Sequence, residues 1–206
     1  MDNPIEILIP KDVANLSLPA PELLTFYKNI NERILWLDAE VDNYCLEFIR
    51  YILSWNQEDK DVPMESRKPI KLLIHSYGGD LDINNSLIDI IKMSQTPIYG
   101  YNMGAACSAA CFIFIACHKR FTMPNAYFLI HKGSSNNIGG TFDQVISEIQ
   151  EYQRKIDTLS EYIMTNTKID EQTFDENIDT EWFISANQSV EYGISDSIIT
   201  SINEII

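Results

Sequence analysis

Basic residues are scarce in this sequence. Its 206 residues contain 15 Lys and Arg against 30 Asp and Glu, which gives a formal net charge of −15 at pH 7. A chain this acidic repels the phosphates of nucleic acids and the headgroups of anionic membranes. The charge balance therefore predicts no nucleic acid partner and no membrane partner, and it favours proteins, peptides or neutral ligands.

Cysteine and long apolar segments are also scarce. The four cysteines are Cys45, Cys107, Cys111 and Cys117. They are too few for a disulfide scaffold in a chain of this length, so we expect reduced, buried thiols. The longest apolar run, from Met103 to Cys117, is shorter than the ~20 residues that span a bilayer and is typical of a buried helix. The N-terminus has acidic flanks and no apolar stretch of signal-peptide length, which predicts a cytoplasmic protein.

A metal site is not expected. Cys107 and Cys111 are spaced to share one face of a helix, but only His118 is near them in sequence. Structural zinc sites almost always have four ligands. We therefore predict neither a metal nor another cofactor.

Strand-like and helix-like segments alternate through much of the chain. The first thirty residues are rich in proline and predict an irregular lead-in, so that regular structure begins at Arg33. Predicted strands cover residues 33–37, 71–75, 97–101, 121–123 and 127–130, and predicted helices cover 41–53, 83–91 and the residues from 104 onward. No linker or repeat interrupts this order, so we expect one domain. The alternation predicts an α/β fold with parallel strands joined by right-handed crossovers.

The longest predicted helix begins at Thr141. Gln144 follows three residues later and predicts a capping box. Apolar residues at helical spacing continue to Ile163, about six turns at 3.6 residues per turn. A stripe of this length exceeds what one small sheet can cover, so part of it is expected to contact another subunit.

Ser108 lies in a segment of small residues between a predicted strand and a predicted helix. Ala106 and Ala110 flank it in a looser version of the strand–turn–helix nucleophile elbow, where glycines occupy these places. The amide of Ala109 would then help to bind an oxyanion. Two alternatives stay open: a close-packed helix with a buried serine, and a thiol nucleophile at Cys107.

A serine nucleophile needs a base, and the chain has three histidines. His131 follows a predicted strand, at the end where open α/β sheets place their sites. His75 occupies a similar position and competes with it, whereas His118 is expected to be solvated. Gly78 and Gly79 follow His75 closely and would let backbone amides approach a ligand, although a double glycine is also an ordinary turn.

Several motifs in one order carry a resemblance to a known family. They are Ile74-His-Ser-Tyr-Gly-Gly79, Asn102-Met-Gly-Ala-Ala-Cys-Ser108, Lys119-Arg-Phe-Thr-Met-Pro-Asn125, Ile130-His131, Phe183-Ile-Ser-Ala186 and Glu191-Tyr-Gly193. Together they resemble the Clp protease proteolytic subunits, which are serine peptidases. The resemblance implies an α/β, ClpP/crotonase-like fold of repeated β-β-α units forming a spiral, with a protruding long handle helix over about residues 139–166. Because the similarity begins at Tyr27, it leaves an N-terminal arm over residues 1–26 and one ClpP-like domain over 27–206.

The resemblance also implies roles for individual residues. Ser108 takes the place of the nucleophile and His131 that of the base. The oxyanion-hole amides fall on Gly79 and Ala109, and His75 falls on a position that is not catalytic in the family.

The resemblance also implies which residues bind the substrate and which residue completes the catalytic triad. The substrate-binding backbone falls on Gly78, Gly139 and Gly140. The family's triad aspartate aligns with Glu181, and Asp179, two residues earlier in an extended segment, is a second candidate. The stretch from Ser108 to His131 is a couple of residues shorter than is usual in the family.

The function implied is a serine endopeptidase. It would hydrolyse peptide bonds of unfolded proteins or peptides inside a chamber of heptameric rings, which could stack as a 14-mer and be served by a Clp-family unfoldase ATPase. Residues 1–26 do not resemble the family's axial-pore loops, which weakens the ATPase expectation. One alternative is a weak or inactive subunit in a mixed ring. Another is an acyl-CoA enzyme of the crotonase class, disfavoured because no basic cluster accompanies the glycines.

Overall fold

The computed structural model describes residues 21–133 and 138–205. By its internal contacts the chain divides into two units, residues 1–32 and residues 33–206. The described part of the first unit contains helix α1 (Pro21–Asn31). The expectation that regular structure begins only at Arg33 was therefore wrong. Pro21 occupies the first helical position, where its missing N–H removes no hydrogen bond. Residues 1–20 of the predicted arm lie outside the described residues.

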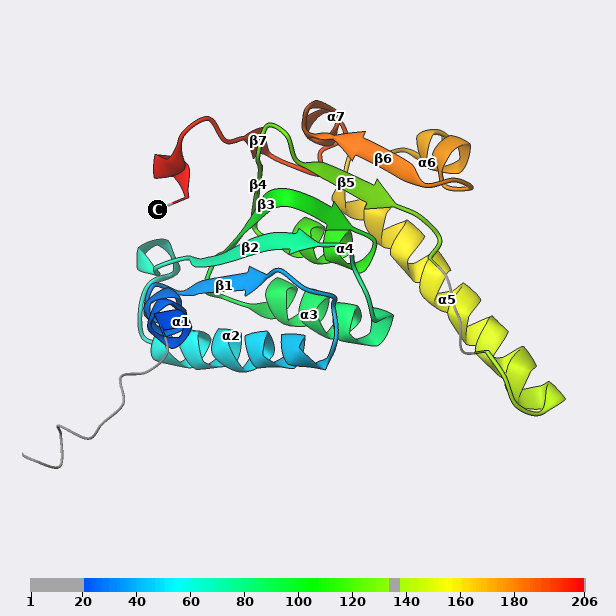
Figure 1. Cartoon of the computed structure of the whole chain (residues 1–206), viewed down its shortest axis with the longest axis horizontal. Helices are drawn as coiled ribbons and strands as arrows, with labels where there is room; N and C mark the ends of the chain where they lie inside the picture. The colour runs from blue at the N-terminus through cyan, green and yellow to red at the C-terminus, as the bar shows by residue number, and fades with distance from the viewer. Residues whose placement is uncertain (1–20, 134–137, 206) are drawn as a thin grey trace, which may run out of the picture. The chain divides into compact units, whose positions relative to one another are not determined.

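The second unit carries the α/β fold (Figure 1). Its strands are β1 (Ile34–Leu37), β2 (Ile70–Ser76), β3 (Ile98–Cys107), β4 (Lys119–Thr122), β5 (Tyr127–Ile130), β6 (Trp182–Ser185) and β7 (Ser197–Ile198). Its helices are α2 (Leu46–Glu58), α3 (Leu81–Met93), α4 (Ala109–Ala116), α5 (Phe142–Asn166), α6 (Glu171–Asn177) and α7 (Ala186–Glu191). Short 3₁₀ turns occupy Asn43–Cys45, Met64–Ser66 and Ile202–Glu204.

The strands of the described residues form one sheet that is mostly parallel, as the alternation predicted. The order is β1-β2-β3-β4-β7, and β5 pairs with both β3 and β6. The β5–β6 pair is antiparallel, and the other pairs are parallel. Strand β3 is long enough to pair with β4 through its first half and with β5 through its second half. This divergence places the end of β5 close to the end of β3.

Strand β3 corrects one prediction. The helix expected from Gly104 begins instead at Ala109, because residues 104–107 continue the strand. Ala106 pairs with Ser76 of β2 on one side and with Phe128 of β5 on the other. Pairing on both edges outweighs the helix propensity of Ala105 and Ala106. Cys107 therefore lies on a strand and does not share a helix face with Cys111.

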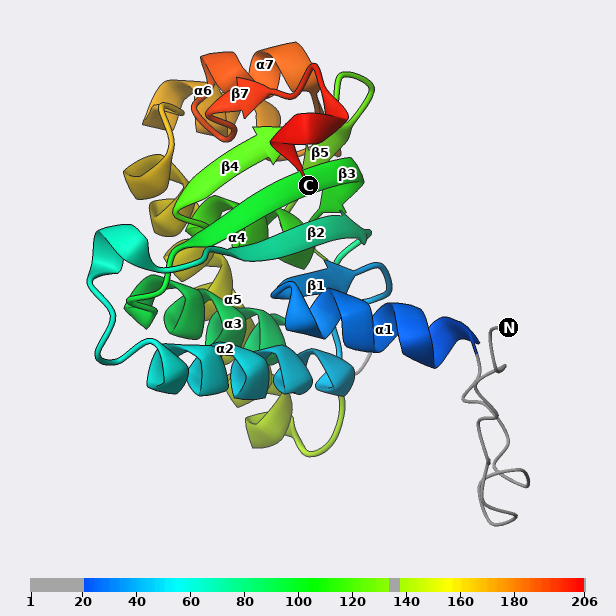
Figure 2. The same ribbon diagram turned by 90° about the vertical axis from the view of Figure 1, so that its left-hand side faces the viewer.

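Helices α2, α3 and α4 cover one face of the sheet, as Figures 1 and 2 show. Helix α4 is the most deeply buried of them, with every side chain from Ala109 to Ile115 excluded from solvent. Ile199 and Ile205, near the C-terminus, pack on the other face against Leu73 and Tyr101. This burial fixes the position of α4 and of Ser108, which directly precedes the helix.

Helix α5 begins with the predicted capping box. The Thr141 hydroxyl accepts a hydrogen bond from the Gln144 amide, and the Gln144 side chain accepts one from the Thr141 amide. Figure 1 shows the N-terminal end of α5 extending away from the sheet. The capping box is local, which is why sequence spacing alone located it.

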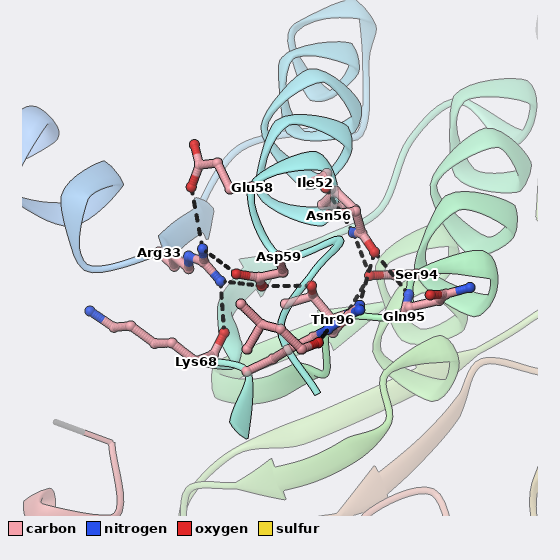
Figure 3. A network of polar contacts seen from close by, with 11 residues as sticks. Arg33, Ile52, Asn56, Glu58, Asp59, Lys68, Ser94, Gln95 and Thr96 are labelled. Atoms are coloured by element: carbon pink, nitrogen blue, oxygen red, sulfur yellow. Dashed lines mark hydrogen bonds and ion pairs between the residues drawn. The ribbon is translucent and has the colours of Figure 1, made fainter. Parts of the chain in front are cut away.

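A buried ion pair joins Arg33, which directly precedes β1, to Asp59, which directly follows α2 (Figure 3). The Arg33 guanidinium donates from Nη1 and Nη2 to the two carboxylate oxygens of Asp59, at 2.6 and 2.9 Å. The side chains of Arg33 and Asp59 are only 12% and 9% exposed. The Thr96 hydroxyl donates to the same carboxylate at 2.8 Å. Arg33 has a positive φ of +59°, so this network holds a backbone conformation that non-glycine residues seldom adopt.

Asp59→Asn is expected to lower the free energy of unfolding by roughly 3 kcal/mol at neutral pH, because it removes the buried counter-charge of the guanidinium and leaves only Glu58, whose side chain is 58% exposed. The hydrogen bond from Arg33 holds the pKa of the Asp59 carboxyl below its ordinary value. The stabilisation of the fold by the ionised Asp59 carboxylate is therefore complete above the pKa of about 3.9 that Asp has in the unfolded chain. It is lost as the pH falls below that value, through the lower pKa of the folded state. Urea denaturation at one protein concentration and several pH values measures both effects.

The matched control is Glu47→Gln. Glu47 pairs with Arg50 on the surface of α2, where the two side chains are 53% and 70% exposed. Exposed pairs contribute about 0–1 kcal/mol, so this variant is expected to unfold almost as the wild type does. Equal stability of Asp59→Asn and Glu47→Gln at pH 7 would contradict the role given to the buried pair.

Candidate active site

Ser108 lies at the junction of β3 and α4 in a strained conformation. Its φ is +52° and its ψ is −125°. Its amide donates to the Leu129 carbonyl of β5 at 2.8 Å, and its carbonyl accepts from the Cys111 amide at 2.9 Å. Ala106 and Ala110 on either side are fully buried. The serine thus lies on a sharp strand-to-helix turn, which is the backbone arrangement of a nucleophile elbow.

His131 directly follows β5 and contacts Glu181. The two atoms in contact are His131 Nδ1 and Glu181 Oε1, 3.0 Å apart. The antiparallel register explains the contact. Ile130 of β5 pairs with Trp182 of β6, so the residue after Ile130, His131, lies opposite the residue before Trp182, Glu181. The histidine side chain is 23% exposed and the glutamate side chain 58% exposed.

Asp179, the second predicted candidate, has a different partner. Its carboxylate forms an ion pair with Lys132 Nζ. Both side chains are exposed, at 78% for Asp179 and 52% for Lys132. Of the two acidic residues that the sequence left open, Glu181 is therefore the one within hydrogen-bond distance of His131.

Ser108 and His131 line one cavity of about 420 Å³. Tyr77, Gly78 and Gly79 form part of its rim. About half of its wall is polar. The apolar part includes Phe112 on α4, Ile130 on β5, Ile156, Leu159 and Ile163 on α5, and Phe174 and Ile178 at α6. The cavity can therefore accommodate an apolar side chain beside the serine.

The glycines approach the serine closely. Gly78 has a φ of +101°, and a Cβ built on it would lie 2.8 Å from the Ser108 Cβ and 3.0 Å from the Ala109 nitrogen. Gly79 lies opposite Val41 in a parallel β-bridge. The two hydrogen bonds of this bridge are made by the residues beside Gly79: the Val41 amide donates to the Gly78 carbonyl, and the Val41 carbonyl accepts from the Asp80 amide. The Gly79 amide takes no part in that bridge. Ala109 is the first residue of α4, so its amide has no acceptor within the helix.

The thiols confirm one prediction and weaken another. All four cysteines are free and buried, as expected. Burial raises the pKa of the Cys107 thiol to about 11, so at neutral pH the group is protonated and a poor nucleophile. The residues that the structure describes contain no group of three or more His, Cys, Asp or Glu side chains that could hold a metal ion.

The other two histidines lie outside the cavity. His75 is exposed on β2, and its ring packs against Gly104, where an added Cβ would lie 2.6 Å from its Nδ1. His118 is exposed, and its Nδ1 accepts a hydrogen bond from the Ile98 amide at 3.1 Å. His131 is thus the histidine that shares a cavity with Ser108.

Gly139 and Gly140 precede α5 and do not line the described cavity. The Gly139 amide donates to Glu148 at 3.3 Å, and Gly140 has a φ of +129°. Their predicted contact with substrate backbone stays a prediction. Lys132 and Tyr152 are among the cavity residues that were not predicted, because neither sequence spacing nor residue type distinguishes them from surface and helix-stripe positions.

No helix within residues 21–133 and 138–205 is long and apolar enough to cross a membrane.

Comparison with known proteins finds Clp protease subunits. The model of the Clp protease family matches residues 22–202. The ATP-dependent Clp protease proteolytic subunit 2 of Treponema denticola is 30% identical over 181 residues, which cover 86% of this chain and 87% of that protein. Proteolytic subunit 1 of Corynebacterium jeikeium is 30% identical over 180 residues, covering 85% of this chain and 91% of that protein.

A solved structure shares the fold. The chain superposes on a point mutant of ClpP1 from Listeria monocytogenes with a TM-score of 0.74 and 22% sequence identity. The alignment covers 88% of this chain and 99% of that one. The structural likeness confirms the predicted ClpP-type fold.

Proposed function

Because the chain belongs to the Clp protease family and is a ClpP-like serine peptidase, we propose that it is an endopeptidase in which Ser108, His131 and Glu181 form the catalytic triad. The contact of His131 with Glu181, in the cavity that Ser108 also lines, is the observation that carries this proposal. Unfolded proteins and peptides are the proposed substrates, because they present extended backbone to the cavity.

In the proposed reaction Ser108 Oγ attacks a peptide carbonyl while His131 Nε2 accepts its proton. The C–N bond then breaks, the imidazolium gives that proton to the leaving amine, and an acyl-enzyme remains on Ser108. Water, deprotonated by His131, releases the acid and restores the serine. Glu181 accepts the hydrogen bond from Nδ1 and stabilises the imidazolium. The 3.0 Å contact with Nδ1 supports this role for Glu181.

The amides of Gly79 and Ala109 are proposed to bind the oxyanion. Their support is the close approach of Gly78 to Ser108 and the position of Ala109 at the start of α4, whose N-terminus favours negative charge. Gly78 is proposed to contribute close backbone contact with the substrate, and Gly139 and Gly140 to pair with its backbone further along.

Members of this family generally form oligomeric rings with Clp ATPases. We propose heptameric rings for this chain, stacked as a 14-mer around a reaction chamber and served by a Clp-class unfoldase. Apolar residues on the extending half of α5 support the stacking, since Phe142 is 79% exposed and Ile149 is 49% exposed.

A glutamate in place of the family's aspartate raises a second candidate, a weak or silent subunit of a mixed ring. The distance from Glu181 to His131 argues for an active site, because the longer side chain does reach Nδ1. Peptidase assays of the pure homo-oligomer, and of the protein co-expressed with a paralogue, separate the two. An acyl-CoA enzyme is disfavoured, because Lys132 is the one Lys or Arg among the described cavity residues and it is paired with Asp179.

Incubation of the assembled protein with a fluorophosphonate probe tests the proposal. Covalent labelling is expected at Ser108, located by peptide mass spectrometry, because the triad activates this serine toward phosphorus electrophiles. An assembled, folded protein that stays unlabelled would contradict the proposed chemistry.

A further inference from the structure

The hydroxyl of Tyr152 contacts the backbone next to the proposed catalytic base. Tyr152 is on α5, and its hydroxyl donates a hydrogen bond to the main-chain carbonyl of Lys132 at 3.0 Å. Lys132 directly follows His131, and Tyr152 lines the same cavity as Ser108. The contact therefore joins α5 to the segment that carries the imidazole.

The turn after His131 is shaped to receive this hydroxyl. Gly133 has a φ of +80°, and a Cβ built on it would lie 3.1 Å from the Tyr152 hydroxyl oxygen. A side chain at this position would press on the hydroxyl, and the positive φ favours glycine in any case. The tyrosine hydroxyl thus fits against the main chain of this segment.

The same segment is held from its other side by the residues that precede β6. Glu181 contacts the His131 ring, and Asp179 pairs with the Lys132 side chain. In both contacts the carboxylate is exposed, at 58% for Glu181 and 78% for Asp179, and ion pairs with exposed groups hold a segment weakly. The Tyr152 hydrogen bond is the contact that fixes the main chain itself.

Tyr152 lies at the boundary between two parts of α5. On its N-terminal side Phe142 and Ile149 are exposed, and Figure 1 shows that end of the helix extending away from the sheet. On its C-terminal side Leu159 and Ile163 are buried. Packing therefore secures α5 just beyond Tyr152, which makes the tyrosine ring a firm support for the turn.

We propose that Tyr152 is a positioning residue for His131. Its hydroxyl fixes the Lys132 carbonyl, so that the imidazole keeps its contact with Glu181 in the cavity that Ser108 also lines. This inference rests on the proposed function, in which His131 is the base. Loss of one such hydrogen bond is expected to lower kcat about fivefold to tenfold. KM should change less than about twofold, since the substrate still meets an aromatic ring at this position.

The test compares Tyr152→Phe with a matched control, Tyr162→Phe. Tyr162 is on the same helix and also donates its hydroxyl to a main-chain carbonyl, that of Phe112 at 3.5 Å, but it does not line the cavity. Each variant is assayed with a fluorogenic peptide, and rates are divided by the number of fluorophosphonate-reactive sites. Hydrogen–deuterium exchange of the peptide that contains residues 130–133 is measured on the same assembled samples.

We expect Tyr152→Phe to lower kcat with KM nearly unchanged and to speed exchange of the His131–Gly133 amides, whereas Tyr162→Phe should change neither. Unchanged exchange at the turn would overturn the inference. Faster exchange with an unchanged kcat would also overturn it, because the bond would then only support the fold. A wild-type protein that the probe does not label contradicts the proposed function instead, and the exchange measurement still decides whether Tyr152 holds the turn.

Discussion

Ser108→Ala is expected to lower kcat for peptide hydrolysis by about 10⁶-fold, the loss seen when a serine peptidase loses its nucleophile. The residual rate reflects only binding and oxyanion stabilisation. The fold should survive for two reasons. The positive φ at this position costs alanine and serine a similar amount of free energy, and the hydrogen bond from the residue 108 amide to the Leu129 carbonyl remains. Steady-state kinetics and thermal unfolding of the assembled variant measure the two effects separately.

Ser86→Ala is the matched control for this substitution. Ser86 lies on α3, where its hydroxyl donates to the Asp82 carbonyl at 2.9 Å and is exposed. We expect its kinetics to equal those of the wild type. If Ser108→Ala kept more than about 1% of wild-type activity, a level far above that residual rate, another group would have to be the nucleophile. Cys107 would be the first to test, although its buried, protonated thiol argues against it.

Local signals in the sequence located the elements around the site well. The capping box at Thr141 depends only on residues three apart, and the small residues around Ser108 indicated the strand–turn–helix junction. The exact junction was misplaced, because Ala and Gly fit either a strand or a helix. The pairing of β3 with β2 and β5 determines that the strand continues to Cys107, and this pairing cannot be predicted from sequence spacing.

Residue pairs that depend on register could not be predicted. The sequence pattern places Asp179 and Glu181 two apart in a predicted extended segment, where both would face the same way, so both stayed candidates. The structure instead has residues 178–180 in a turn that precedes Glu181. The antiparallel pairing of Ile130 with Trp182 brings Glu181 into contact with His131, whereas Asp179 forms an ion pair with Lys132. Tyr152 illustrates the same limit, since its place in an apolar stripe says nothing about where its hydroxyl ends.

Glu181→Gln is expected to lower kcat between about 10²-fold and 10⁴-fold. Replacement of a buried triad aspartate by its amide costs about 10⁴-fold, because the amide neither enforces the required imidazole tautomer nor stabilises the imidazolium. Glu181 is 58% exposed, so water screens part of its charge and a smaller loss is reasonable. Glutamine has nearly the shape of glutamate, so the walls of the cavity should change little and KM is expected to stay within about twofold.

Asp179→Asn separates the two acidic residues in the same assay. Its carboxylate is 78% exposed and pairs with Lys132, and an exposed pair contributes little, so we expect less than about a threefold change in kcat. Glu181→Asp adds a test of reach. It keeps the charge but draws the carboxylate back by one C–C bond, about 1.5 Å, on a backbone placed for glutamate. A larger loss in Asp179→Asn than in Glu181→Gln would reverse the assignment, and full activity in both would mean that His131 works without a carboxylate partner.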